Sequence, residues 1–98
     1  MEITKVEIRP MKSEGNLKAF CSVVFDDVFV VHSVKVVQGK ERLFVAMPSR
    51  ELGRGGFRDI AHPIDNEFRV KLEKIILERY REEVEQGREE LVTEDVTL

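Results

Sequence analysis

Hydrophobic residues in the first part of the chain recur at every second position, which is the period of a half-buried β-strand. From Leu17 to Phe25, apolar residues alternate with a second set of positions that is only partly apolar. An earlier segment, Ile3 to Arg9, has Val6 and Ile8 two apart between charged residues. We predict a strand in each segment, and we expect Pro10 to end the first one because proline cannot donate to a sheet ladder.

Two further strands are expected after a tight turn. Asp26 and Asp27 form the predicted tip of a hairpin. The segment Val28 to Val37 is dense in valine, and such a run of β-branched residues favours a strand that is buried on both faces over part of its length. A short strand from Leu43 to Met47 follows, and Pro48 is expected to close it.

The alternation then breaks down between Ser49 and Phe57. Gly53, Gly55 and Gly56 fall within four consecutive positions, and ordering so many glycines costs too much backbone entropy for regular structure. We therefore predict a mobile loop here, followed by a short extended piece from Ile60 to Ile64.

The spacing of apolar residues changes to that of a helix in the last third of the chain. One stripe is formed by Phe68, Leu72, Ile75, Ile76 and Val84. Asp65 precedes this stripe as the predicted N-cap, because its carboxylate can accept from the free N–H groups of the first turn. Strands followed by a helix, without βαβ alternation, predict the α+β class: an antiparallel β-meander of four to five strands followed by one long C-terminal helix.

Length and cysteine content exclude several classes of protein. The 98 residues suffice for one domain, which would be only marginally stable as a monomer. A lone cysteine, Cys21, excludes an intrachain disulfide framework and is expected to be a packing residue. Because the chain has neither an apolar run of membrane-spanning length nor a signal-peptide core, we expect a cytoplasmic protein without a membrane partner.

Charge is distributed unevenly along the chain. The formal net charge of −3 excludes a globally basic nucleic-acid binder but not a locally basic face. Residues 1–64 carry a net +2 and residues 65–98 a net −5. We predict a single domain at residues 1–86 and an acidic, flexible tail at residues 87–98. The tail either solubilises the protein or competes with nucleic acid for a basic face.

Groups suited to catalysis are few. Asp59 and His62 could form an acid–base pair or provide two metal ligands, but no third group lies at a recognisable spacing. The alternative is that both fix the loop by hydrogen bonds and by a salt bridge from Asp59 to Arg58. His32, inside the valine-rich segment, is expected to be a core or edge residue. We therefore predict no enzymatic activity, no cofactor, no metal and no small-molecule substrate.

Basic residues give the stronger functional signal. Three arginines recur at steps of four in the glycine-rich segment, and each guanidinium is a forked donor that can reach a phosphate backbone. The glycines lack the strand and helix that flank a nucleotide-binding phosphate loop. Two lysines on the predicted helix are the second choice. The candidate nucleic-acid-binding residues are therefore Arg50, Arg54, Arg58, Lys71 and Lys74.

The order of residues in three segments is distinctive: Phe29–His32, Leu43–Ser49 and Phe57–Ile64. Together, in this order and at this separation, they resemble the signature of the SpoVG family of septation proteins, named for stage V sporulation protein G. The opening of the chain, with Ile3, Thr4 and Val6, is similar too. The resemblance covers roughly residues 1–83.

The resemblance implies a small β-meander with a C-terminal helix that pairs as a homodimer. It also implies binding to DNA and RNA, and regulation of gene expression, of septum formation and, in spore formers, of sporulation. In the family, binding is associated with basic residues after the Met-Pro-Ser segment. Here Arg50 matches the first of these positions, Glu51 replaces the next, and Arg54 is expected to restore the charge. The alternative is a protein-interaction module that acts in cell division without direct nucleic-acid binding.

Overall fold

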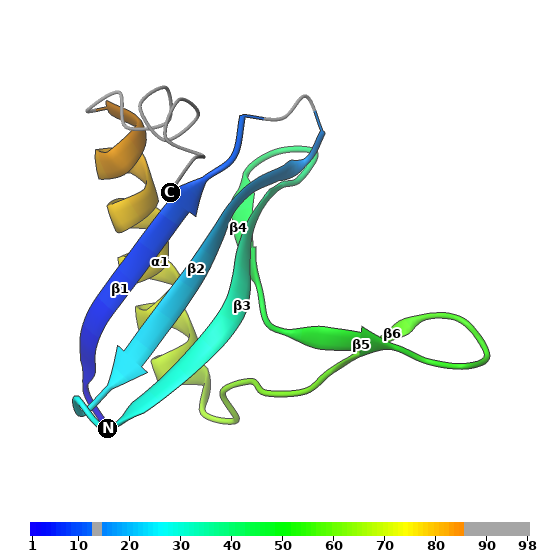
Figure 1. Ribbon diagram of the computed structural model, residues 1–98, viewed down its shortest axis with the longest axis horizontal. Helices are drawn as coiled ribbons and strands as arrows, with labels where there is room; N and C mark the ends of the chain where they lie inside the picture. Colours follow the sequence, from blue (N-terminus) through cyan, green and yellow to red (C-terminus); the bar gives the residue numbers. More distant parts are fainter. Residues whose placement is uncertain (13–14, 86–98) are drawn as a thin grey trace, which may run out of the picture.

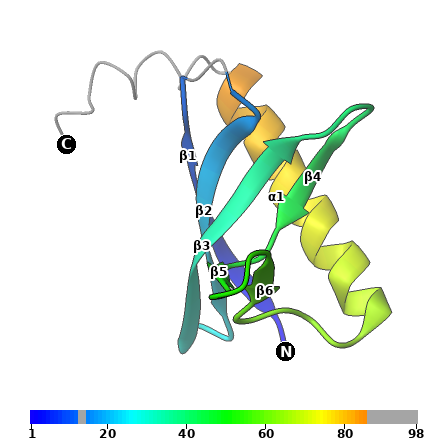
Figure 2. The same cartoon turned by 90° about the vertical axis from the view of Figure 1, so that its right-hand side faces the viewer.

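The computed structural model describes residues 1–12 and 15–85, so the predicted tail at residues 87–98 lies outside them. Within this part, a meander with the strand order β1-β2-β3-β4 forms an antiparallel sheet, and one helix packs across a single face of it (Figures 1 and 2). The elements are β1 (Ile3–Pro10), β2 (Leu17–Phe25), β3 (Phe29–Gln38), β4 (Leu43–Ala46) and α1 (Asn66–Glu85). The predicted α+β class and its order of elements are confirmed.

The turn between β2 and β3 is the tight hairpin that the sequence predicts. Asp26 and Asp27 both adopt positive φ angles, of 52° and 58°, and the backbone N–H of Val28 donates to the carbonyl oxygen of Phe25 at 3.0 Å. Two consecutive positive φ angles match the twist of the flanking strands, and aspartate tolerates this conformation better than most residues. Asp26 also accepts from the backbone N–H of Glu2 at 2.9 Å, which ties the turn to the N-terminus.

A β-bulge interrupts the pairing of β2 with β3. The register shifts so that His32 and Ser33 both lie opposite Ser22, and Ser33 takes a positive φ of 66°. An extra residue in one strand re-aims the side chains beside it. Beyond the bulge, Val34 and Val36 return to the inner face and are fully buried.

The hydrophobic core lies between the sheet and α1. Its buried members are Val6, Ala19, Cys21, Val23, Phe25, Val34, Val36, Leu72, Ile76, Leu77 and Tyr80. The prediction that part of the valine-rich strand is buried on both faces is wrong for the single chain, because on its outer face Val30 is 42 % exposed and Lys35 and Val37 are only half-buried. The reason is that the helix covers only one face of the sheet (Figure 2).

Asp65 caps α1 as the sequence predicts. Its Oδ2 accepts from the backbone N–H of Phe68 at 2.8 Å, and its carbonyl oxygen accepts from the N–H of Arg69 at 3.0 Å. Farther along the helix, Glu73 Oε2 accepts from the backbone N–H of Val45 at 3.3 Å and so attaches α1 to the edge strand β4.

The predicted mobile loop from Ser49 to Phe57 is wrong. This segment begins a two-stranded hairpin in which β5 (Ser49–Glu51) pairs with β6 (Phe57–Asp59). Gly55 and Gly56 have φ angles of 91° and 86°, so the glycines supply the conformations that the turn needs. We call residues 49–59 the arm.

The predicted extended piece from Ile60 to Ile64 is also not a strand. Its first residue instead closes the base of the arm, because the backbone N–H of Ile60 donates to the carbonyl oxygen of Pro48 at 2.7 Å. The chain then turns toward α1 through Pro63. The strand that the sequence placed here lies three residues earlier, in β6.

Candidate nucleic-acid interface

The arm projects sideways from the sheet (Figure 1) and carries three of the predicted binding residues. Arg50 on β5 and Arg58 on β6 are direct cross-strand partners, and Arg54 lies in the turn that joins the two strands. All three residues are exposed. Arginines that are four apart in the sequence are therefore gathered on one small element by the pairing of the hairpin.

No carboxylate neutralises these arginines within residues 1–12 and 15–85. Arg50, Arg54 and Arg58 form no ion pair there, and Asp59 is paired in register with Ser49 rather than with an arginine. The salt bridge from Asp59 to Arg58, one of the alternatives for this segment, is thus not formed in the described residues. Free guanidiniums on a projecting element can each present a planar fork of donors to an external phosphate.

The two predicted lysines lie on a different element. Lys71 and Lys74 are exposed on α1, on the side of the helix opposite its buried stripe. Glu67 precedes the first by four residues and Glu78 follows the second by four, a spacing at which opposite charges are neighbours on a helix. The arm and the helix are therefore separate basic regions, and each carries acids near its cations: Glu51 and Asp59 on the arm, Glu67 and Glu78 on the helix.

Asp59 and His62 do not form the acid–base pair that their spacing allows. His62 Nδ1 donates instead to the carbonyl oxygen of Pro63 at 3.0 Å. Within the described residues, no group of three or more histidine, cysteine or acidic side chains could hold a metal ion.

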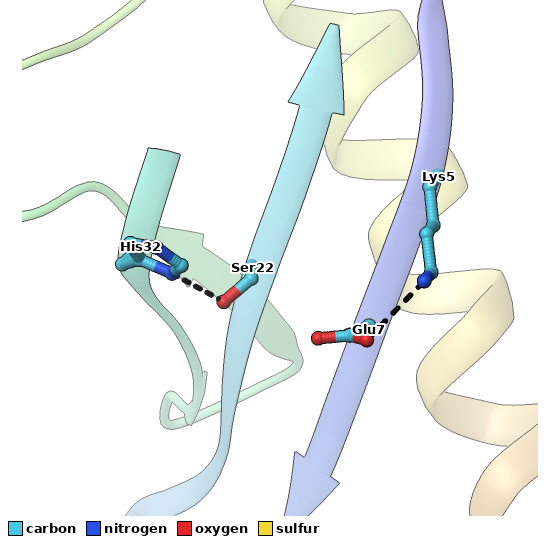
Figure 3. A network of polar contacts seen from close by, with 4 residues as sticks. All are labelled: Lys5, Glu7, Ser22 and His32. Carbon is cyan, nitrogen blue, oxygen red and sulfur yellow. Dashed lines mark hydrogen bonds and ion pairs between the residues drawn. The ribbon is translucent and has the colours of Figure 1, made fainter. Parts of the chain in front are cut away.

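His32 lies on the open face of the sheet, the face that turns away from α1. Its Nδ1 is 2.8 Å from Ser22 Oγ on the neighbouring strand (Figure 3). The side chain is exposed, on a stretch of β3 that pairs with β2 but not with β4, so of the two expected positions, core or edge, the structure shows the edge position. Cys21, by contrast, is buried as predicted, and desolvation raises the pKa of its thiol to about 12. A thiol with such a pKa is a poor nucleophile at neutral pH.

Several large apolar side chains are exposed at the β2–β3 turn, on the arm and in the segment that follows it, and none of them was singled out by the sequence pattern. They are Val28, Phe29, Phe57, Ile60 and Ile64, all more than half exposed. Phe29 and Ile60 line the same groove, beside Pro48 at the base of the arm. Exposed apolar groups gathered in this way mark an interaction surface. The signal available in the sequence was the apolar character of both strand faces at residues 28–31.

The SpoVG family profile matches residues 1–82. The chain belongs to the SpoVG family. It is 52 % identical over 80 residues to a protein of Alkaliphilus oremlandii, a match that covers 82 % of this chain and 86 % of that relative. It is 51 % identical over 82 residues to a protein of Clostridioides difficile (84 % and 89 % covered). A third relative, from Caldanaerobacter subterraneus subsp. tengcongensis, is 54 % identical over 80 residues (82 % and 88 % covered).

Each of these three SpoVG relatives bears the name "Putative septation protein SpoVG". The match includes all six strands, the arm and most of α1. The resemblance drawn from the residue order of three segments is therefore confirmed. The relatives are named for septation and not for an enzymatic reaction. Among the described residues of this SpoVG chain, no helix is both long and apolar enough to cross a membrane.

Proposed function

We propose that this SpoVG-family protein is a dimeric regulator in the cytoplasm that binds DNA and RNA. Through that binding it influences gene expression, septum formation and, in spore formers, sporulation. The observation that supports the proposal best is the arm, on which Arg50 and Arg58 face each other without a neutralising carboxylate in the described part of the chain. The arm is therefore suited to bind an anionic partner whose charges are closely spaced.

Electrostatics favours a ligand at this position. Like charges directly opposite each other on a hairpin are destabilising, by roughly 0.2–1 kcal/mol on the scale of cross-strand pairs. A phosphate placed between two guanidiniums reverses the sign of that interaction. Contacts of this kind hold a nucleic-acid backbone without reading its sequence.

Dimerisation is the second part of the proposal. Three apolar side chains are largely exposed: Ile64 by 93 %, Phe57 by 74 % and Ile60 by 66 %. A small domain buries little apolar surface of its own, so covering these side chains with a second copy would add to its stability. A second copy that covers them would bury this surface and would place two arms in one assembly. Six arginines would then be available to one nucleic-acid ligand or to two equivalent ones.

The same exposed apolar residues favour a second candidate, a protein-interaction module that acts in cell division without direct nucleic-acid binding. The net charge of −3 also favours it. The two functions differ in salt dependence, because phosphate contacts release counterions and therefore weaken steeply as salt rises. An apolar protein interface responds to salt much less.

The test compares two charge-matched double variants of the full chain in titrations with duplex DNA at two salt concentrations. Arg50→Ala with Arg54→Ala removes two cations from the arm. Lys40→Ala with Arg42→Ala removes two exposed cations from the β3–β4 turn and serves as the control. Circular dichroism verifies that both variants are folded.

We expect the arm variant to bind more weakly than the control and to show a flatter salt dependence. Each lost phosphate contact lowers the slope of log K against log salt by about 0.9 on duplex DNA. Equal affinities and slopes for the two variants would move the site away from the arm, most directly to Lys71 and Lys74. A wild-type protein that binds no nucleic acid at either salt concentration would favour the protein-interaction module.

A further inference from the structure

The open face of the sheet carries a row of three residues suited to an unpaired nucleic-acid strand. We propose that this face is a second nucleic-acid site, at which Phe20 stacks on an unpaired base while Arg9 and Lys35 hold the adjoining phosphates. The inference deepens the proposed function and rests on it. In this arrangement the arm contacts the backbone of a duplex, and the open face binds a single strand.

The row is fixed by the register of the sheet. Arg9 on β1 pairs with Phe20 on β2, which in turn pairs with Lys35 on β3. Neighbouring strands are about 5 Å apart, so a cation stands on each side of the ring. All three side chains lie on the open face, and Arg9 and Phe20 line one hollow of about 430 Å³. Phe20 and Lys35 border an adjoining hollow of about 610 Å³, which continues along β3 to Phe29 and Ile60. The single strand is assigned to the end at Phe20 and Lys35, and the contact between copies to the end at Ile60.

The charge of the open face suits a polyanion, although the whole chain is acidic. The outward positions of the four strands hold the cations Lys5, Arg9, Lys18 and Lys35. The acid among these positions, Glu7, is already matched, because its Oε2 lies 3.4 Å from Lys5 Nζ (Figure 3). In the part of the chain that the structure describes, Arg9, Lys18 and Lys35 form no ion pair. A row of free cations beside an aromatic ring is the composition of a single-strand-binding groove.

Hydrogen-bonding groups stand beside the ring because of the β-bulge. His32 and Ser33 both border the two hollows, and His32 contacts Ser22 Oγ at 2.8 Å. These hydroxyl and imidazole groups can donate and accept, as the edges of an unpaired base require. The positive φ of Ser33 is the backbone feature that brings two consecutive polar side chains to this face.

The ligand is a single strand because the aromatic ring needs an accessible base. In a duplex each base is stacked on its neighbours and presents only its edge, so the ring of Phe20 would find no partner. Unpaired bases can splay out and stack on an aromatic side chain, which changes affinity by roughly tenfold for one base. Arginine and lysine beside the ring then contribute the salt-dependent part of the binding.

The experiment measures binding of the full chain to labelled oligo(dT) of about 10 nucleotides, a length within the range that small single-strand-binding folds occupy. The same titrations are made with duplex DNA. The main variant is Phe20→Leu, which keeps an apolar side chain but removes the aromatic face. Its matched control is Phe44→Leu, because Phe44 is 37 % exposed and Phe20 is 36 % exposed. Phe44 lies opposite Val37 on the same sheet, with no cation in its row.

A second variant, Lys35→Gln, tests the charge without touching the ring. We expect Phe20→Leu to weaken oligo(dT) binding by about tenfold and Phe44→Leu to leave it near the wild-type value. Lys35→Gln is expected to weaken oligo(dT) binding and to flatten its salt dependence by somewhat less than one unit of slope. Duplex binding should stay unchanged in all three variants, with circular dichroism as the folding control.

Three outcomes overturn the inference while the proposed function stands. One is a wild-type protein that binds duplex DNA but not oligo(dT). Another is an equal effect, or none, of Phe20→Leu and Phe44→Leu. The third is a change of sedimenting mass on Phe20→Leu, which would assign the open face to contact between copies. A wild-type protein that binds neither ligand would overturn the inference and the proposed function together.

Discussion

Arg50 and Arg58 are direct cross-strand partners on a hairpin that projects from the sheet, and no described carboxylate pairs with either (Figure 1). Two like charges on one face of a two-stranded element raise the free energy of the free protein. Two arginines that repel each other in the free protein, and that both attract an anion placed between them, are what we expect at an anion-binding site. Stability and binding should therefore respond in opposite directions when one of the two arginines is removed.

The first prediction follows from this pair. Arg58→Thr removes one of the two facing charges and introduces a residue with good β-propensity. We expect the free energy of unfolding to stay the same or to rise by a few tenths of a kcal/mol, and duplex DNA binding to weaken. Chemical denaturation and a binding titration measure the two effects.

Arg42→Thr, at the exposed β3–β4 turn, is the matched control for the loss of one positive charge. It should change DNA binding less than Arg58→Thr does. A marked loss of stability in Arg58→Thr would show that this arginine supports the arm, which would contradict the account of the facing pair.

The second prediction concerns the exposed apolar residues. Phe57→Ser together with Ile60→Ser should convert a dimer into a species of 11.4 kDa in sedimentation, because the proposed contact between copies depends on these side chains. Val70→Ser, at a helix residue that is 65 % exposed, is the control and should leave the dimer intact. Wild-type protein that sediments only as the 11.4 kDa species at micromolar concentration would contradict the prediction.

The third prediction tests the N-cap of α1. Asp65→Ala removes the acceptor of the 2.8 Å bond from the N–H of Phe68 and should lower the free energy of unfolding by about 1 kcal/mol. Asp65→Asn keeps an acceptor oxygen and should retain most of that stability. Because the cap is at the far end of the helix from the predicted tail, deletion of residues 89–98 should not alter the difference. Equal stability of the alanine and asparagine variants would refute the capping role.

Elements with a strong local signal were predictable from the sequence. The alternation of β2, the two aspartates of the β2–β3 turn and the cap at Asp65 each follow from the preference of a few neighbouring residues, and all three are confirmed. The family was predictable as well, from the order of residues in three segments. These features can be predicted without knowing which elements pack against one another.

Features that depend on pairing across the chain were not predictable. Consecutive glycines such as Gly55 and Gly56 predict a mobile loop, whereas here they form a turn that brings Ser49–Glu51 beside Phe57–Asp59. The bulge at Ser33 is not predictable because a positive φ at serine has no sequence signature, and this bulge places Ser33 beside His32 and returns Val34 to the inner face. The row of Arg9, Phe20 and Lys35 exists only once the register of three strands is known.

The fourth prediction uses the buried thiol of Cys21. Burial raises its pKa from the ordinary value of 9.0 to about 12, so above about pH 9 the unfolded chain loses this proton while the folded chain keeps it. The unfolded state then binds fewer protons, and stability falls as pH rises. Between about pH 8 and pH 10 this one group should lower the free energy of unfolding by about 1.4 kcal/mol, since one pKa unit corresponds to about 1.36 kcal/mol.

Denaturation of wild type and Cys21→Ala at both pH values isolates the contribution of the Cys21 thiol, because the other titrating groups are common to both proteins. The alanine variant will be less stable throughout, through the lost packing, but its stability should fall less with pH than that of the wild type. Parallel pH dependences, or rapid modification of the native thiol by a disulfide reagent at neutral pH, would show that Cys21 is more accessible to water than its packing between the sheet and α1 implies.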